Sequence, residues 1–412
     1  MVALLATLAF CLLWLRERSL EQQALFLGLW VLSPCFILYA RMARSYTLQA
    51  ALALVAIRFA QDWLREPGNR WKMARYVLAA VALLYTHYLP GLGVVAGTAL
   101  LGLWRRQWRQ ATALAAITLA YVPWVGTLAQ TSDVVAHSSP YRLSANAVVE
   151  HALKLGYAFV DFNFGETIPL WAMGLAAALL PAIGWALWKA WQGTAHPPAL
   201  FFLVAAIGYF GAANWLSFPF VGARLLFLLP FYYLFLLRGL DARRWHGAIT
   251  YAGLLLIAFG GLSSYYRKQD FLNKGYVVDF DEIAQSLRQS SSGEPALVLL
   301  DRRISDAGYY LHGPRFPYRV VILGGSGAFE RARIELSHHR PALVWYLRYG
   351  RDMTAGALHN RLEDEVARDY TIDRHYFVPF SWLDHKAMQW LGQTDRPTHL
   401  IEALELRRKP MP

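Results

Sequence analysis

The chain is poor in cysteine and in charge. Only two of its 412 residues are cysteines, Cys11 and Cys35, and both lie in apolar stretches without histidines at metal-ligand spacing. A disulfide framework is therefore excluded, and we expect two buried thiols. Charged residues make up 17% of the chain against 56% hydrophobic residues. A soluble domain of this composition would expose a large apolar surface, so the composition indicates a polytopic membrane protein.

A concentrated basic face of the kind that binds nucleic acid is missing too. The net charge is +12, but up to Tyr266 the chain holds 19 Lys and Arg against 9 Asp and Glu, and beyond it 21 against 19. The excess positive charge belongs to the apolar part, where it indicates membrane topology and attraction to lipid headgroups. We therefore expect the bilayer as a partner, and no nucleic acid.

Apolar stretches of membrane-helix character fill residues 1–266. A bilayer needs about 20 apolar residues per helix, and outside a closed barrel only helices satisfy the backbone there. About ten helices are predicted, at Val2–Leu15, Gln23–Ala40, Tyr46–Trp63, Arg75–Leu89, Gly91–Trp104, Ala111–Gln130, Thr167–Lys189, Ala199–Phe218, Val221–Leu237 and His246–Tyr265. The first is short, so we expect that the chain opens partway through a helix whose beginning lies upstream.

The orientation follows from the basic residues near the helix ends, which favour the cytoplasm. One set of loops holds thirteen of them, and the other set holds five, namely Arg41, Arg44, Arg142, Lys154 and Arg224. The thirteen are predicted to be cytoplasmic. The protein is then a multi-pass protein of the inner membrane, or plasma membrane, with both Met1 and its C-terminal domain on the outside, the periplasm in a bacterium with two membranes.

Two parts of the chain lie outside the predicted membrane helices. Residues 131–166 form a long outside loop whose amphipathic piece, Ser144–Phe159, is expected to lie along the membrane surface. Residues 267–412 form a small soluble α/β domain. Its strands are predicted at Ala296–Leu300, Arg319–Leu323, Ala342–Tyr346 and Thr398–Arg407, with helices at Asp281–Arg288 and Ala328–His338.

Three sets of ionisable residues lie at the outside ends of the predicted helices. Arg41 and Arg44 precede Tyr46, and a pair of guanidinium groups at headgroup depth suits a lipid phosphate. Arg224 begins another helix on the same side and could contact the same anion. In each case the alternative is an arginine that only anchors its helix at the membrane surface. His87, between Tyr85 and Tyr88, is more typical of an interfacial hydrogen-bonding residue than of a base.

Chemistry on a ligand at such a site would need a carboxylate, either as a base or to hold a divalent cation. The outside loop offers four, Asp133, Glu150, Asp161 and Glu166, and none stands in an obvious pair. We expect all four to be solvated loop charges. The histidines of the C-terminal domain, His375 among them, lack metal-ligand spacing and are expected at the surface. The sequence thus assigns no metal site and no certain cofactor; a divalent cation is the one candidate.

Short motifs spread along the helical part resemble those of the GT-C superfamily of polyprenyl-phosphate-sugar-dependent glycosyltransferases. The chain is most similar to the bacterial family-39 group with the RgtA/B/C/D-like domain, relatives of protein mannosyltransferases and of the aminoarabinose transferase of lipid A. The motifs are Ser33-Pro34, Ala40–Leu48, Leu84–Tyr88, Val122–Trp124 and Ala223–Leu225 with Pro230. The expected fold is mostly α: a polytopic GT-C-type transmembrane module, 1–266, followed by the soluble α/β domain, 267–412.

The resemblance implies a membrane glycosyltransferase. Sugar would pass from a polyprenyl-phosphate donor to a lipid, glycan or protein acceptor at the outer face, with inversion, and Arg44, Tyr46, His87 and Arg224 would line the cavity for the lipid phosphate. The family carries its catalytic Asp in a first outside loop that lies upstream of everything in this chain, so no catalytic residue is assigned. Two alternatives stay open: an inactive, truncated homologue, and a transporter or flippase of lipid-linked saccharides.

Overall fold

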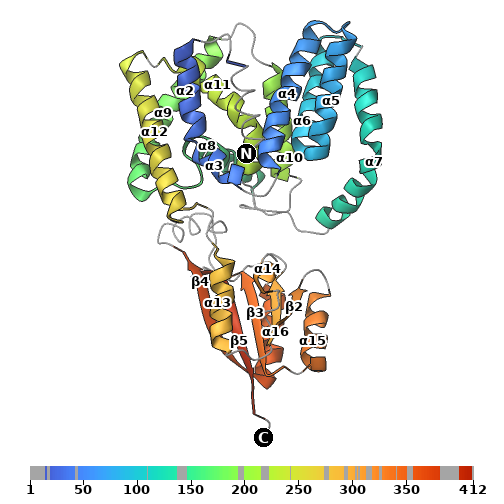
Figure 1. The fold of residues 1–412 in the computed structure, drawn as a ribbon, viewed down its shortest axis with the longest axis vertical. Coiled ribbons are helices and arrows are strands. Elements are labelled where there is room, and N and C mark those ends of the chain that lie inside the picture. The colour runs from blue at the N-terminus through green and yellow to red at the C-terminus, as the bar shows by residue number, and fades with distance from the viewer. Residues whose placement is uncertain are drawn as a thin grey trace. The chain divides into compact units, whose positions relative to one another are not determined.

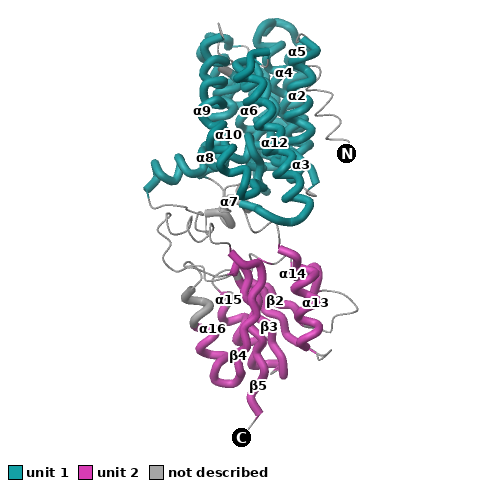
Figure 2. Tube along the Cα trace, turned by 90° about the vertical axis from the view of Figure 1, so that its left-hand side faces the viewer, with its two compact units in different colours: residues 1–272 teal, residues 273–412 magenta. Residues whose placement is uncertain are grey.

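The computed structural model divides the chain into two compact units, Met1–Leu272 and Asn273–Pro412 (Figure 2). The boundary predicted after Tyr266 falls at the end of the last helix of the first unit. The structure describes residues 14–15, 19–41, 45–108, 110–136, 146–193, 199–214, 222–241, 243–272, 278–291, 296–301, 304, 307–311, 318–323, 327–339, 341–349, 356–380 and 399–410.

The first unit is helical (Figure 1). Its helices follow the predicted segments in order, apart from Val2–Leu15, most of which lies outside the described residues. Their bounds are α2 Leu20–Val31, α3 Pro34–Arg41, α4 Tyr46–Arg65, α5 Arg70–Thr86, α6 Tyr88–Trp104, α7 Gln110–Ala136, α8 Ala147–Phe164, α9 Leu170–Gln192, α10 Ala199–Asn214, the 3-10 helix η1 Gly222–Leu228, α11 Leu229–Gly239 and α12 Trp245–Tyr266.

Only some of these helices are long and apolar enough to cross a membrane. Among the described residues three qualify, α9, α12 and the continuous pair η1–α11, with a fourth if α2 and α3 form one span bent by 53°. The prediction of about ten spans is therefore supported only in part. The bend falls where Pro34 cannot continue a helix, so the segment predicted as one helix is two. Helices α6 and α10 are apolar but shorter.

The second unit is a five-stranded mixed sheet in the order β2-β1-β3-β5-β4. Strand β1 pairs parallel with β2 and β3, and β5 pairs antiparallel with β3 and β4. The strands are β1 Ala296–Asp301, β2 Tyr318–Leu323, β3 Leu343–Tyr349, β4 Tyr370–Pro379 and β5 His399–Arg408; the helices are α13 Phe280–Ser291, α14 Ala307–Leu311, α15 Ala328–His339 and α16 Gly356–Asp369. All four predicted strands and both predicted helices are confirmed.

Strand β4 and helices α14 and α16 were not predicted. Strand β4 lies at the edge of the sheet and mixes charged with apolar residues, so it lacks the continuous apolar run of a buried strand. The sheet has a core on each face. Helices α13 and α14 cover the face of Val298 and Trp345, and α15 and α16 cover the face of Leu299 and Val344 (Figure 1).

A buried ion-pair network lies on the second of these faces. Arg348 is 4% exposed and donates to Glu402 Oε2 from Nε at 2.9 Å and from Nη2 at 2.7 Å. It also pairs with Glu363 of α16, and Arg374 of β4 reaches Glu402 at 2.6 Å and Glu363 at 2.7 Å. Burial acts to raise the pKa of Glu402, but the two arginines outweigh it and hold that pKa below its usual value.

The first prediction concerns Arg348. Replacing it with Met removes one partner from a buried network and leaves Glu402 with only the half-exposed Arg374, so we expect the second unit to lose about 3–5 kcal/mol of stability. The measurement is the urea concentration at which half of the second unit is unfolded, detected by limited proteolysis of the whole protein. Arg333→Met, in an exposed pair of α15, is the control and should shift the midpoint little. Equal shifts for the two variants would contradict the assigned role of Arg348.

Candidate functional site

Three of the four residues predicted for the lipid-phosphate site are described. Tyr46 is the first residue of α4, His87 lies in the turn between α5 and α6, and Arg224 lies in η1. Arg44 lies outside the described residues. The structure thus tests whether three segments that are far apart in sequence meet.

His87 and Arg224 lie close enough to interact. The imidazole Nδ1 accepts a hydrogen bond from Leu89 N–H at 3.2 Å, which caps α6 and fixes the ring. His87 lies outside both flanking helices. Burial, and then the charge of Arg224, lower the pKa of the imidazole to about 4. The ring is therefore neutral at physiological pH beside a fixed guanidinium charge.

Tyr46 connects to the same region through α4. One turn along that helix, Gln49 donates from Nε2 to the carbonyl of Ala223 at 3.4 Å, next to Arg224. Tyr46 itself is buried and meets the ring of Tyr39 edge-on, with centroids 5.8 Å apart. The start of α4, the turn at His87 and η1 therefore meet in one region of the first unit.

Sequence reasoning missed a pair of buried carboxyl groups in this region. Asp161, in the last turn of α8, is 0% exposed, and Glu166, just beyond the helix, is 1% exposed. The prediction that both are solvated loop charges is wrong. Burial, followed by the proximity of Glu166, raises the pKa of Asp161. Burial also raises the pKa of Glu166 against the opposing effect of its hydrogen bonds.

Tyrosines from two helices satisfy Glu166. Tyr39 of α3 donates to Oε1 at 2.5 Å, and Tyr157 of α8 donates to Oε2 at 2.5 Å. The backbone of Glu166 is also held in place. Its carbonyl oxygen accepts a hydrogen bond from Leu272 N at 2.8 Å, next to the β-bridge between Thr167 and Phe271. Glu166 therefore joins the end of α8 to the segment after α12.

Asp161 faces α3 and η1. Its Oδ2 accepts from the Cys35 thiol at 3.4 Å. A side chain at Gly222 would overlap the same oxygen, so only glycine fits there. Because Gly222 is two residues before Arg224, the acidic pair, the 3-10 helix and the basic group are parts of one packed arrangement.

The other two carboxylates of the loop have different places. Glu150 is buried in α8 and pairs with Lys154 at 2.7 Å, whose Nζ also donates to Ala213 O at 2.7 Å. The predicted solvation of Glu150 is therefore also wrong. Asp133 belongs to α7, and its side chain lies outside the described residues.

The arrangement can do two kinds of chemistry. A fixed guanidinium with a neutral imidazole beside it can bind a phosphate, and two buried carboxyl groups that disfavour double ionisation can hold and release a proton. A sequence signal for the acids existed: Asp161 lies in the run Phe159–Phe164, where four of six residues are apolar. An acid in such a run is costly to bury, and its presence calls for a partner.

Comparison with protein-family models, with curated proteins and with solved structures found no match.

The second prediction concerns the proton held by the acidic pair. Because burial raises the pKa of Asp161, the folded state keeps a proton that the unfolded state releases above about pH 4. Stability should fall as pH rises from there to the raised pKa, by up to about 1.4 kcal/mol per pH unit for each proton. Asp161→Asn should flatten this fall, measured as the thermal midpoint of the detergent-solubilised protein between pH 4.5 and 9.

Asp241→Asn, at an exposed carboxylate of the same unit, is the matched control and should keep the wild-type slope. A slope unchanged in Asp161→Asn would show that Asp161 is ionised in the folded protein at every pH tested.

Proposed function

We propose that the chain is a multi-pass glycosyltransferase of the inner membrane that takes a sugar from a polyprenyl-phosphate carrier. The observation that carries the proposal is the meeting of the start of α4, His87 and Arg224, which belong to three separate motifs of the GT-C resemblance, around η1 beside two buried carboxyl groups. Helices long and apolar enough to span a bilayer support a membrane setting.

The basic part of the site suits the donor. Arg224 would bind the carrier phosphate through its planar guanidinium. Its positive charge would stabilise the transition state more strongly as negative charge develops on the leaving phosphate. Because Nδ1 of neutral His87 already accepts from Leu89 N–H, its Nε2–H can donate one hydrogen bond to the same anion, and Arg44 would be the second guanidinium. An apolar carrier would reach such a site from the bilayer.

The acidic part suits the acceptor. The acceptor oxygen would attack the anomeric carbon, the bond from that carbon to the phosphate oxygen would break, and the hydroxyl proton would pass to a carboxylate. With Asp161 holding the proton of the buried pair, Glu166 would take the proton of the acceptor, with polyprenyl phosphate as the leaving group. The acceptor is a hydroxyl of a lipid, glycan or protein.

The third prediction tests the phosphate contact. Arg224→Gln should lower kcat/KM for transfer from a polyprenyl-phosphate sugar by about 10- to 100-fold, since a charge-assisted hydrogen bond is worth about 1.5–3 kcal/mol. Arg44→Ala should abolish transfer. The measurement uses radiolabelled donor and purified protein in lipid nanodiscs. Arg238→Gln, at an exposed arginine of α11, is the control and should keep wild-type rates.

Unchanged transfer in Arg224→Gln would contradict the proposed role of that residue. Wild-type protein that binds the donor but transfers nothing would favour the inactive homologue.

The fourth prediction concerns topology. Reporter fusions at Arg44, at Arg224 and at the C-terminus should all show alkaline phosphatase activity and no GFP fluorescence, as expected of periplasmic ends. A fusion at Gly68, between α4 and α5, should show the opposite pattern and serves as the control. Arg44 and Arg224 on opposite sides of the membrane would exclude a shared phosphate site.

A further inference from the structure

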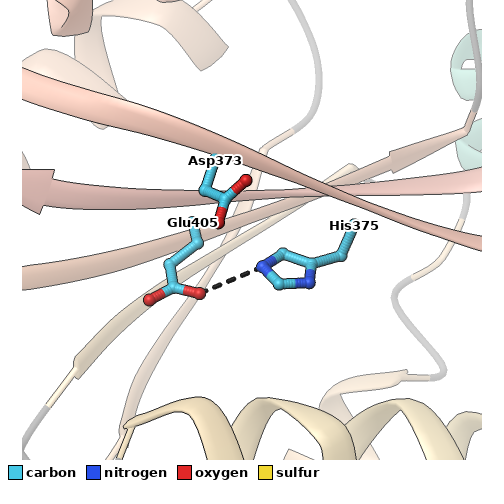
Figure 3. Close-up of side chains that lie close together, drawn as sticks. All are labelled: Asp373, His375 and Glu405. Carbon is cyan, nitrogen blue, oxygen red and sulfur yellow. Dashed lines mark hydrogen bonds and ion pairs between the residues drawn. The ribbon is translucent and has the colours of Figure 1, made fainter.

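Strands β4 and β5 of the second unit bring together three side chains that bind metals in other proteins. Asp373 of β4 lies directly opposite Glu405 of β5 in the antiparallel register, and His375 follows two residues later on the same face. One ligand atom from each lies within 4.8 Å of the other two. Figure 3 shows the imidazole pointing toward the Glu405 carboxylate, with Nε2 at 3.0 Å from Oε2.

We propose that Asp373, His375 and Glu405 form a binding site for a divalent transition metal. The site is independent of the glycosyl transfer proposed for the first unit. It also corrects the expectation that His375 is a surface residue without metal-ligand partners, because that expectation considered spacing along the chain, whereas the three ligands come together across two strands.

The electrostatics of the strand pair favour a cation at this position. Two carboxylates directly opposite each other on one face of an antiparallel pair repel. Arg407 compensates part of this charge, with Nε and Nη2 both 2.6 Å from Glu405 Oε1. That contact leaves Oε2 directed at His375, so the carboxylate oxygen that faces the imidazole is the one that would bind the metal.

The set of donors suits particular metals. One imidazole nitrogen with two carboxylates is typical of Zn²⁺, Mn²⁺ or Co²⁺, whereas Mg²⁺ and Ca²⁺ prefer oxygen ligands alone. Bonds of about 2.0–2.2 Å from a tetrahedral metal put two ligand atoms about 3.4 Å apart. His375 Nε2 and Glu405 Oε2, now 3.0 Å apart, would need to separate by only about 0.4 Å, and a rotation of the exposed Asp373 would bring in the third ligand.

The exposure of the three ligands increases from Glu405 to His375 to Asp373. Glu405 is 5% exposed, His375 is half-buried, and Asp373 is exposed. Trp345 of β3, opposite Glu405 in register, is 1% exposed and has its ring centroid 5.2 Å from that of His375. The inner ligands are therefore held by packing, and water can complete the coordination from the outer side.

The fifth prediction tests this site on the whole protein in detergent, after treatment with EDTA and removal of the chelator. Calorimetric titration with Zn²⁺ should show one site per chain. His375→Ala and Asp373→Asn should each weaken Zn²⁺ binding at least 10-fold, because each removes one of three ligands. His338→Ala and Asp364→Asn, at an exposed histidine of α15 and an exposed carboxylate of α16, are the matched controls and should bind as the wild type does.

A second readout locates the metal. Paramagnetic Co²⁺ should quench part of the tryptophan fluorescence of the wild type, and Trp345→Phe should lose that part while keeping the Zn²⁺ affinity. Circular dichroism of each variant checks that the sheet is intact. A wild type that binds no Zn²⁺ at micromolar concentrations, or equal binding in His375→Ala and His338→Ala, would overturn the proposal.

Discussion

The cost of burying Asp161 and Glu166 is the constraint on which the site of the first unit depends. A carboxyl group out of reach of water must keep a proton or find donors, and here the donors come from different parts of the chain. Tyr39 of α3 and Tyr157 of α8 serve Glu166, and the thiol of α3 serves Asp161. Helices α3 and α8, which are far apart in sequence, are joined by these hydrogen bonds.

The same constraint positions the basic residues. Glycine at position 222 lets η1 approach Asp161, and the 3-10 turn that follows directs Arg224 toward His87. A bulkier residue would hold η1 away from α8 and change the place of the guanidinium. The conformation of η1 therefore links the acidic and basic parts of the site, so a displacement of Asp161 would also displace Arg224. Such a link is what coupled binding of a phosphate and transfer of a proton would require.

The sequence predicted which segments are helical and most of the second unit, because apolar runs and their periodicity depend on local residues. Several predictions that failed concern contacts between segments that are distant in sequence. Asp161 and Glu166 looked like loop charges, since nothing local shows that Tyr39 will reach Glu166. The partner of Glu150 is Lys154, four residues further along α8, a spacing that the sequence does show. The bend between α2 and α3 follows from Pro34, and the sequence signal was there. The meeting of His87 with Arg224 was inferred only from a resemblance, because their separation along the chain hides it.

The two faces of the sheet show how the second unit manages charge. On the face of α16, the buried Glu402 and the partly buried Glu363 meet two arginines, Arg348 and Arg374, and the charges cancel. On the opposite face, Asp373 and Glu405 meet one arginine, Arg407, and an imidazole. The two carboxylates and the one guanidinium leave one negative charge there. A divalent cation would cancel it with one charge to spare while using an imidazole nitrogen as a ligand. The mixture of His with acids is therefore suited to a metal in a way that the arginine network of the other face is not.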